Sequence, residues 1–467
     1  MPRIQPLRGW RYDLAAAGAA SLNELLTPPY DVINPAQQAA FYDRHPCNVV
    51  RLELTADQVG DDDHDNRYTR AAATLAGWQA GGVLRQEAAP AIYLLRQRYR
   101  LPDGQEATRA GLIFRLRLAP WGEGILPHER TFPAAKADRL ALTMATGAQC
   151  SPIFLLYADP AGAAQAPLTA AAAGRQPDAA YCDSDGVEHT LWAVTEPAAL
   201  AAAAAALETK TFYIADGHHR YETALNYQRW RRGGGLPDVP APAPLSSWQE
   251  LPNSAQAGPA PPDAAQPFDT AWVYAACLED PGVAILPTHR CLHDLPGIES
   301  ARLLAGLDEH FIVTPVEEDA TLKTLDFFGR SPTSGTSGTT FALALSGQPG
   351  GYRLELRDDP ATRARLLADY PPAVAAVDVA VLQSLALGPL LGIDADPTEL
   401  KRFVAFTPSA AEAIDGVRAG RYQAAFLVHS TPLAQLQAVS DADQVMPPKA
   451  TYFYPKLPAG LLINCLE

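Results

Sequence analysis

Two hydrophobic periods alternate along the chain and together predict a mixed fold. Short runs rich in aliphatic and aromatic residues, bounded by turn-forming residues, are typical of strands. Apolar positions that recur every three or four residues indicate amphipathic helices. Predicted strands occur both as neighbouring pairs and separated by helices, which favours an α+β (mixed α/β) arrangement of mixed sheets with flanking helices over a regular doubly wound sheet.

The same periods locate the individual elements. Strands are expected at 92–98, 111–118, 152–157, 211–215, 272–278, 283–286, 340–345, 352–356, 422–429 and 461–464. Helices are expected at 65–80, 197–208, 221–231, 299–310, 360–370, 379–390 and 409–419. Four segments follow: an N-terminal α/β region at 1–158, a strand-turn-helix unit at 159–232, a mobile Pro/Gly-rich insertion at 233–268, and a C-terminal α/β region at 269–467 that completes the site.

Composition and charge exclude several classes of protein. The 37 Lys and Arg against 52 Asp and Glu give a net charge of −15, opposite to the field that a nucleic-acid binder needs. The six cysteines show no pairing pattern typical of a zinc or disulfide scaffold. Neither a signal-peptide core nor a long apolar run is present, so we expect a cytoplasmic protein without a membrane or nucleic-acid partner.

The chemically richest segment is Asp216-Gly217-His218-His219-Arg220. Alternating apolar residues before it predict a strand, Gly217 permits a sharp turn, and a helix is expected to follow. Free amides and the positive end of the helix dipole would then favour an anion. Arg220 and the two imidazoles could bind phosphate oxygens, while Asp216 could hold Mg²⁺ or accept a hydroxyl proton. The alternative is an exposed polar turn capped by Asp216.

Smaller polar clusters elsewhere could belong to the same site. A predicted loop carries His128, Glu129, Lys136 and Arg139, and a predicted strand ends before His289 and Arg290. Cations and imidazoles of this kind suit an anionic substrate, although solvated surface turns have the same composition. The residues expected to contact the substrate are Tyr30, Asp31, Glu222 and Lys456.

Eight segments, taken in order, resemble a bacterial and archaeal family of conserved domains of unknown function that carries the motif DGHHRYET. They cover 27–33, 48–54, 128–139, 151–154, 215–225, 286–290, 378–393 and 449–464. The chain departs from the family pattern at Gln149-Cys150 and at Gln383-Ser384. If the residues that the family usually has at the second position are catalytic, this chain has altered activity.

The segment from Asp216 to Arg220 is also similar, more distantly, to the signature of free-serine kinases with a ParB/sulfiredoxin-like fold. That resemblance implies a strand-turn-helix unit that binds nucleotide phosphates, and a glutamate base outside the segment. Glu129 is the first candidate for that base and Glu53 the second.

Three hypotheses about function follow. The first is a kinase that phosphorylates the hydroxyl of a small metabolite, free L-serine above all, with ATP, ADP or pyrophosphate as donor and Mg²⁺ on Asp216. The chain lacks a Walker motif, which excludes a P-loop kinase. The second is a metal-dependent phosphatase or other hydrolase, with a metal on His128, His218, His219, His289 and Asp216. The third is a nucleotide-binding regulatory protein without turnover.

Overall fold

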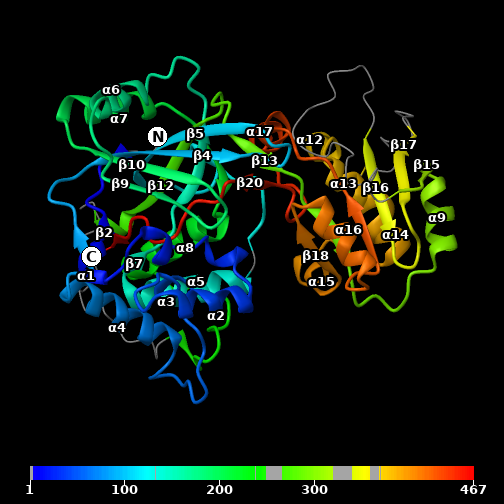
Figure 1. Cartoon of the computed structure of the whole chain (residues 1–467), viewed down its shortest axis with the longest axis horizontal. Helices are drawn as coiled ribbons and strands as arrows, with labels where there is room; N and C mark the ends of the chain where they lie inside the picture. Colours follow the sequence, from blue (N-terminus) through cyan, green and yellow to red (C-terminus); the bar gives the residue numbers. More distant parts are fainter. Residues whose placement is uncertain are drawn as a thin grey trace. The chain divides into compact units, whose positions relative to one another are not determined.

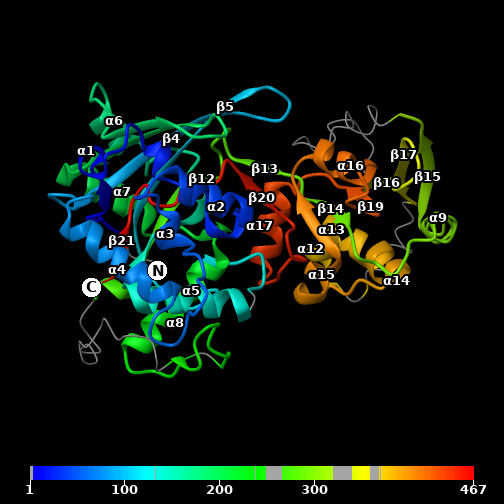
Figure 2. The same cartoon turned by 60° about the horizontal axis from the view of Figure 1, so that its bottom comes forward.

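A computed structural model describes residues 4–131, 133–236, 238–248, 266–318, 339–357, 368 and 370–466. These residues form two compact units (Figures 1 and 2). The first unit comprises 1–126, 131–283 and 455–467, and the second comprises 127–130 and 284–454. Within the described part of the chain, every helix is too short or too polar to cross a membrane.

The first unit is built on a large mixed sheet. Its strands are β1 (Ile4–Gln5), β4 (Ile92–Arg100), β5 (Glu106–Arg117), β6 (Ile125–Leu126), β8 (Ile153–Tyr157), β9 (Ala179–Cys182), β10 (Glu188–Val194), β11 (Phe212–Asp216) and β12 (Thr270–Cys277). The order is β6-β11-β8-β12-β5-β4-β10-β9, and β1 pairs with β5. β11 runs parallel to β6 and β12 parallel to β8, whereas β11 and β8 are antiparallel.

Helices flank this sheet. They are α1 (Leu14–Ala17), α2 (Pro35–Arg44), α3 (Val50–Glu53), α4 (Arg67–Ala80), α5 (Pro133–Thr146), α6 (Ala166–Ala172), α7 (Pro197–Leu207) and α8 (His218–Arg231). In the view of Figure 1, α6 and α7 lie above the sheet and α4 and α5 lie below it. Strand residues such as Phe114, Leu155 and Phe212 are completely buried in one core. Burial of that apolar surface is the main force that holds the strand ends, and the site at one of them, in place.

Two short strand pairings complete the first unit. They join β2 (Trp10–Tyr12) to β3 (Leu84–Gln86) and β7 (Ala148–Gln149) to β21 (Asn464–Cys465). The second pairing ties the C-terminal segment to the strand that leads into β8. Segments from both ends of the chain therefore contribute to the same unit.

The second unit contains an antiparallel sheet in the order β15-β17-β16-β19-β14-β18. Its strands are β14 (His289–Leu292), β15 (Phe311–Val316), β16 (Thr340–Leu345), β17 (Gly351–Leu356), β18 (Val404–Thr407) and β19 (Ala424–Leu427); β13 (Ala284–Leu286) separately pairs with β20 (Tyr452–Tyr454). The helices are α9 (Ser300–Asp308), α12 (Pro372–Ala375), α13 (Asp378–Leu382), α14 (Gly388–Leu391), α15 (Pro397–Phe403), α16 (Ala410–Arg418) and α17 (Leu433–Asp441), with a π-helix at Gln383–Leu387. Ile414 and Val417 of α16 share a core cluster with Cys291 and Leu427 of the sheet. Figure 2 shows α16 beside β19.

The structure confirms the predicted mixed α/β class, with mixed sheets and flanking helices. Most of the predicted elements appear with small shifts of their ends, whereas residues 360–367 and 369 of the predicted helix 360–370 lie outside the described residues. One local prediction is wrong: Lys136 and Arg139 lie on α5 instead of in a loop. His289 and Arg290 follow the predicted strand, which is β13, and themselves begin β14. Glu53 lies on α3.

The compact units do not follow the borders of the four predicted segments. β12, which follows the Pro/Gly-rich stretch, pairs with β5 and β8, so hydrogen bonding places it in the first unit. Of that stretch, residues 233–236, 238–248 and 266–268 are described, and Leu245 and Phe268 share a core cluster with Tyr227 of α8. Apolar packing therefore anchors the described parts of the predicted insertion.

Candidate functional site

The predicted strand-turn-helix corner is present, formed by β11, Gly217 and α8. Phe212 and Ile214 are buried in the core, and the helix begins at His218, with Tyr221 N–H donating to the Gly217 carbonyl. Gly217 has φ +96°, a left-handed value that favours glycine, and an added Cβ would lie 3.0 Å from Cζ of Arg220. A glycine at the N-cap offers no side chain to the first amides of the helix, so these amides face whatever lies beyond the corner.

Asp216 ends β11 and holds two cations. Nη2 of Arg220 donates to one carboxylate oxygen at 2.5 Å, and Nζ of Lys456 donates to the other at 3.1 Å. Arg220 also donates to the carbonyl oxygen of Pro152. Burial opposes the charge of Arg220, but Asp216 together with Asp31, Tyr30 and Glu53 outweighs burial and raises the pKa of the guanidinium. Two cations on one carboxylate leave a net positive charge at the N-terminus of α8, which favours an anionic ligand.

This arrangement does not suit the predicted role of Asp216 as a magnesium ligand. Each carboxylate oxygen already accepts a hydrogen bond from a cation, and two positive charges beside the carboxylate would repel Mg²⁺. Mg²⁺ in phosphoryl-transfer sites is also held largely by substrate phosphates and water. We therefore derive no step through a metal on Asp216.

Two of the predicted residues neutralise each other on neighbouring helices. Nζ of Lys136 on α5 donates to Glu222 on α8 at 2.9 Å, and the hydroxyl of Thr131 donates to the same carboxylate. Both side chains of the ion pair are about one-fifth exposed, so solvent weakens the attraction. The pair fixes α5 against α8 near the corner. The charge of Lys136 is already compensated by Glu222, so Lys136 is a poor candidate for a phosphate ligand.

Arg139 is buried between α3 and α5. It donates to Asp138 and to the backbone carbonyl of Glu53, and its guanidinium lies 4.1 Å from the ring centre of Tyr30. Burial lowers the pKa of Arg139, but Asp138, Glu53 and Tyr30 together outweigh burial and raise this pKa overall. Asp31, beside Tyr30, is exposed and adds negative charge near Arg220. Most of the predicted charged residues of the first unit thus form ion pairs, which join Lys136 to Glu222, Arg139 to Asp138, and both Arg220 and Lys456 to Asp216.

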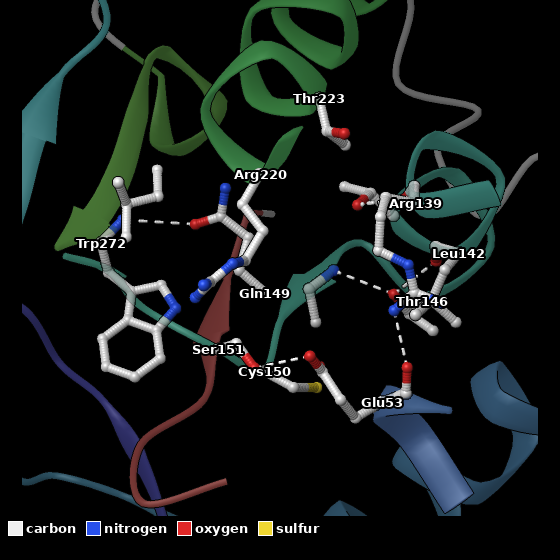
Figure 3. Close-up of a pocket in the computed structure, with 13 residues that line it drawn as sticks. Glu53, Arg139, Leu142, Thr146, Gln149, Cys150, Ser151, Arg220, Thr223 and Trp272 are labelled. Atoms are coloured by element: carbon white, nitrogen blue, oxygen red, sulfur yellow. Dashed lines mark hydrogen bonds between the residues drawn. The ribbon is translucent and has the colours of Figure 1, made fainter. Parts of the chain in front are cut away.

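A small cavity lies beside this corner (Figure 3). Its volume is about 50 Å³, several times what one water molecule needs but far less than a nucleotide occupies. The polar and aromatic residues that line it include Glu53, Arg139, Ser151, Arg220, Thr223 and Trp272. Glu53 is 4% exposed, and its carboxylate accepts a hydrogen bond from the Ser151 hydroxyl at 2.6 Å. The cavity is a partly open, charged space that suits a small polar ligand.

The remaining predicted residues belong to the second unit. Nε2 of His128 lies 3.0 Å from the Thr451 hydroxyl, and a carboxylate oxygen of Glu129 accepts from the backbone N–H of Lys449 at 3.2 Å. Nδ1 of His289 accepts from the backbone N–H of Val428 at 3.1 Å. These contacts hold both the Pro127–Arg130 segment and β14 in the second unit.

Arg290 differs from the arginines of the first unit. It is buried and donates to the carbonyl oxygens of Thr288 and Lys449. Burial lowers its pKa to about 9, against a smaller opposite effect of Glu129. Burial and the charge of Arg290 lower the pKa of His289 to about 3, so this imidazole is neutral at physiological pH.

Two further cavities lie in the first unit. One, of about 500 Å³, is lined by residues such as Arg8, Trp10 and Arg115 and by none of the predicted site residues. The other, of about 110 Å³, includes Lys456 among its lining residues. The larger volume alone does not make a site, whereas the cavity beside Arg220 borders the motif.

Sequence reasoning missed much of the cavity wall. Thr223 and Trp272 carried no recognisable signal, because a threonine inside a helix and a tryptophan inside a strand are ordinary core positions. Ser151 was included only within the family segment 151–154, and Glu53 was named only as the second candidate for a base. Their proximity depends on β8, β12, α3 and α8 coming together, which no local pattern encodes.

Fold and site together describe a mixed α/β protein with a strand-turn-helix corner of paired charges. The chain belongs to the family described as Protein of unknown function (DUF1015), whose profile matches residues 4–380. This confirms the family resemblance expected from the eight ordered segments. No curated protein matches the chain.

Several solved structures are similar to the chain at a low level. A conserved hypothetical protein from Pyrococcus furiosus is 11% identical, with a TM-score of 0.31, and the match covers 75% of this chain and 93% of that one. A free serine kinase in complex with AMP is 10% identical, with a TM-score of 0.32, and the match covers 75% and 92%. A mutant of free serine kinase in complex with ADP gives the same values. Likeness at this level assigns no activity to the chain.

Proposed function

We propose that the chain is a small-molecule phosphotransferase that works at the corner between β11 and α8. The observation that carries the proposal is the Asp216–Arg220–Lys456 cluster at an uncapped helix N-terminus, directly beside the cavity that contains Glu53. Amides and cations at the corner suit phosphate groups, while the cavity suits a small acceptor.

Phosphoryl transfer fits this arrangement because it depends on positioning and charge neutralisation more than on covalent chemistry. In the proposed reaction the donor, which is ATP, ADP or pyrophosphate, places its phosphates against the amides of α8, Arg220 and Lys456. The acceptor is the hydroxyl of a small metabolite, and free L-serine is the first compound to test. For the base that accepts the hydroxyl proton, Glu129 of the second unit remains a prediction, and Glu53 is the candidate within the first unit.

The proposal is tested by ³¹P NMR of the protein with Mg²⁺, L-serine and each donor in turn. We expect a new phosphomonoester signal with one donor. Arg220→Gln should lower the rate by on the order of 10²-fold or more, if Arg220 clamps phosphate as arginines do in other phosphotransferases. The control is Arg98→Gln, because Arg98 is an exposed arginine of the same unit that pairs only at the surface with Glu188.

Two results would count against the proposal. Unchanged turnover in Arg220→Gln would remove the corner from the reaction. Binding of nucleotide without product in any pairing of donor and acceptor would favour a regulatory nucleotide-binding protein. Thermal unfolding of both variants shows whether a lost rate reflects lost folding.

A further inference from the structure

We propose that the cavity beside Arg220 is the acceptor site and that it selects a hydroxylated amino acid, whose ammonium group binds Glu53. This inference rests on the proposed function for the role of the hydroxyl, but it concerns binding and can be tested without turnover. It assigns Glu53 to recognition of a cationic group, instead of leaving it as the second candidate for a base.

The first argument is the state of the Glu53 carboxylate. It is buried, and within the described part of the chain it forms a hydrogen bond with Ser151 but no ion pair. Arg139 lies nearby, yet its guanidinium is bound to Asp138 and to the backbone carbonyl of Glu53. Arg139 and Arg220 act on the Glu53 carboxylate only from beyond ion-pair distance. A buried carboxylate that no cation contacts directly is costly, and a ligand that supplies a positive charge with N–H donors would compensate it.

The second argument comes from two unsatisfied polar atoms in the cavity wall. Nε1 of Trp272 and Oγ1 of Thr223 are buried and have no hydrogen-bond partner among the residues that the structure describes. Both residues line the cavity, and Figure 3 shows the nitrogen-bearing edge of the Trp272 ring on the side of Arg220. Native proteins rarely leave such groups unpaired, so a ligand or ordered water is expected there. An indole N–H is a donor only and requires an acceptor oxygen.

The third argument is size. One water molecule needs roughly 10–15 Å³ on this kind of measure, so a cavity of about 50 Å³ admits only a compact ligand. The ligand must carry an ammonium group toward Glu53 and acceptor oxygens toward Trp272 and Arg220. A small amino acid with a hydroxyl has the required size, the ammonium group and the acceptor oxygens. A nucleotide or a sugar phosphate is too large.

Isothermal titration calorimetry of the full chain tests the inference with three probes. L-serine carries both the ammonium and the carboxylate, ethanolamine lacks the carboxylate, and glycerate lacks the ammonium. We expect L-serine to bind at least about tenfold more tightly than the other two, because each lost charge-assisted hydrogen bond weakens binding by roughly 10- to 100-fold. Comparable binding of glycerate would overturn the inference.

Glu53→Gln keeps the shape of the side chain and removes its charge. It should weaken L-serine binding by about 10- to 100-fold while changing glycerate binding little, a shift in selectivity that a merely structural role would not produce. Glu188→Gln, which removes an exposed carboxylate of the same unit, is the matched control. If Glu53→Gln does not fold, Trp272→Phe provides the second test and should weaken L-serine binding by about fivefold through one lost hydrogen bond.

The outcomes separate this inference from the proposed function. Glu53-dependent binding of L-serine without product from any donor would retain the amino-acid site and reject phosphotransfer. Phosphorylated product with an unchanged KM for L-serine in Glu53→Gln would retain phosphotransfer and reject the amino-acid site.

Discussion

The two units contain the same dipeptide, His-Arg, in opposite electrostatic surroundings. In the first unit, His219-Arg220 lies in the first turn of α8, and Arg220 pairs with Asp216. In the second unit, His289-Arg290 begins the buried strand β14, and Arg290 donates to backbone carbonyl oxygens without an ion pair among the described residues. Identical side chains therefore meet a carboxylate in one case and neutral dipoles in the other.

The difference shows in the pKa values. Burial acts against the charge of both arginines, but Asp216 raises the pKa of Arg220, whereas the pKa of Arg290 falls to about 9. Nearby negative groups, Asp216 foremost among them, thus keep the buried guanidinium of Arg220 charged. Three predictions test how far this contrast extends.

The largest expected effect comes from removing the carboxylate partner of a buried arginine in the first unit. Asp138 accepts from Arg67, Tyr68 and Arg139. Asp138→Asn should lower the free energy of unfolding by about 3 kcal/mol, the low end for a broken buried pair because Asp138 is about a quarter exposed. Urea unfolding followed by circular dichroism measures the change.

The matched control for Asp138→Asn is Glu188→Gln. Glu188 pairs with Arg98 at the surface, where about half of each side chain is exposed, so we expect a loss below about 1 kcal/mol. Equal losses in the two variants would show that burial of Arg139 does not set the strength of its pairing.

The second prediction concerns His289 in the second unit. Its pKa falls from 6.5 to about 3 on folding, because of burial and then because of Arg290 and His429. The unfolded chain binds this proton below about pH 6.5 and the folded chain does not, so stability must fall as pH drops from about 6.5 toward 3. Between these pH values, His289 contributes a slope that approaches about 1.4 kcal/mol of unfolding free energy per pH unit.

His289→Asn tests that slope, since the amide oxygen of asparagine can still accept the hydrogen bond from Val428. The variant should lose acid stability more gradually than the parent between pH 6.5 and pH 4 in denaturant titrations. His64→Asn, at an exposed position, should leave the slope unchanged. A parent and a His289→Asn variant with parallel pH profiles would contradict a buried neutral imidazole.

Local chemistry in the sequence predicted more of the fold than of the site. The strand, glycine turn and helix around Asp216 follow from apolar alternation and from one residue that tolerates positive φ, and both signals are local. Arg139 was predicted in a loop between the strands at 111–118 and 152–157, yet it lies on α5, buried against Asp138 and Glu53. Ion pairs of this kind, and the wall formed by Trp272, depend on contacts between distant segments, so spacing along the chain cannot reveal them.

The smallest expected effect concerns Gly217 itself, compared with Gly420 of the second unit. Both glycines have positive φ, +96° and +73°, so alanine at either position costs about 1 kcal/mol or more in backbone strain. At Gly420 an added Cβ meets nothing within 4 Å, whereas at Gly217 it lies 3.0 Å from Cζ and Nε of Arg220. Gly217→Ala should therefore lower the free energy of unfolding by up to about 1 kcal/mol more than Gly420→Ala does. The extra loss arises because the guanidinium must shift while it stays bound to Asp216. Thermal unfolding of the two variants side by side measures the difference. Equal losses would mean that Arg220 moves freely, and the rigid corner that the proposed phosphate site requires would not exist.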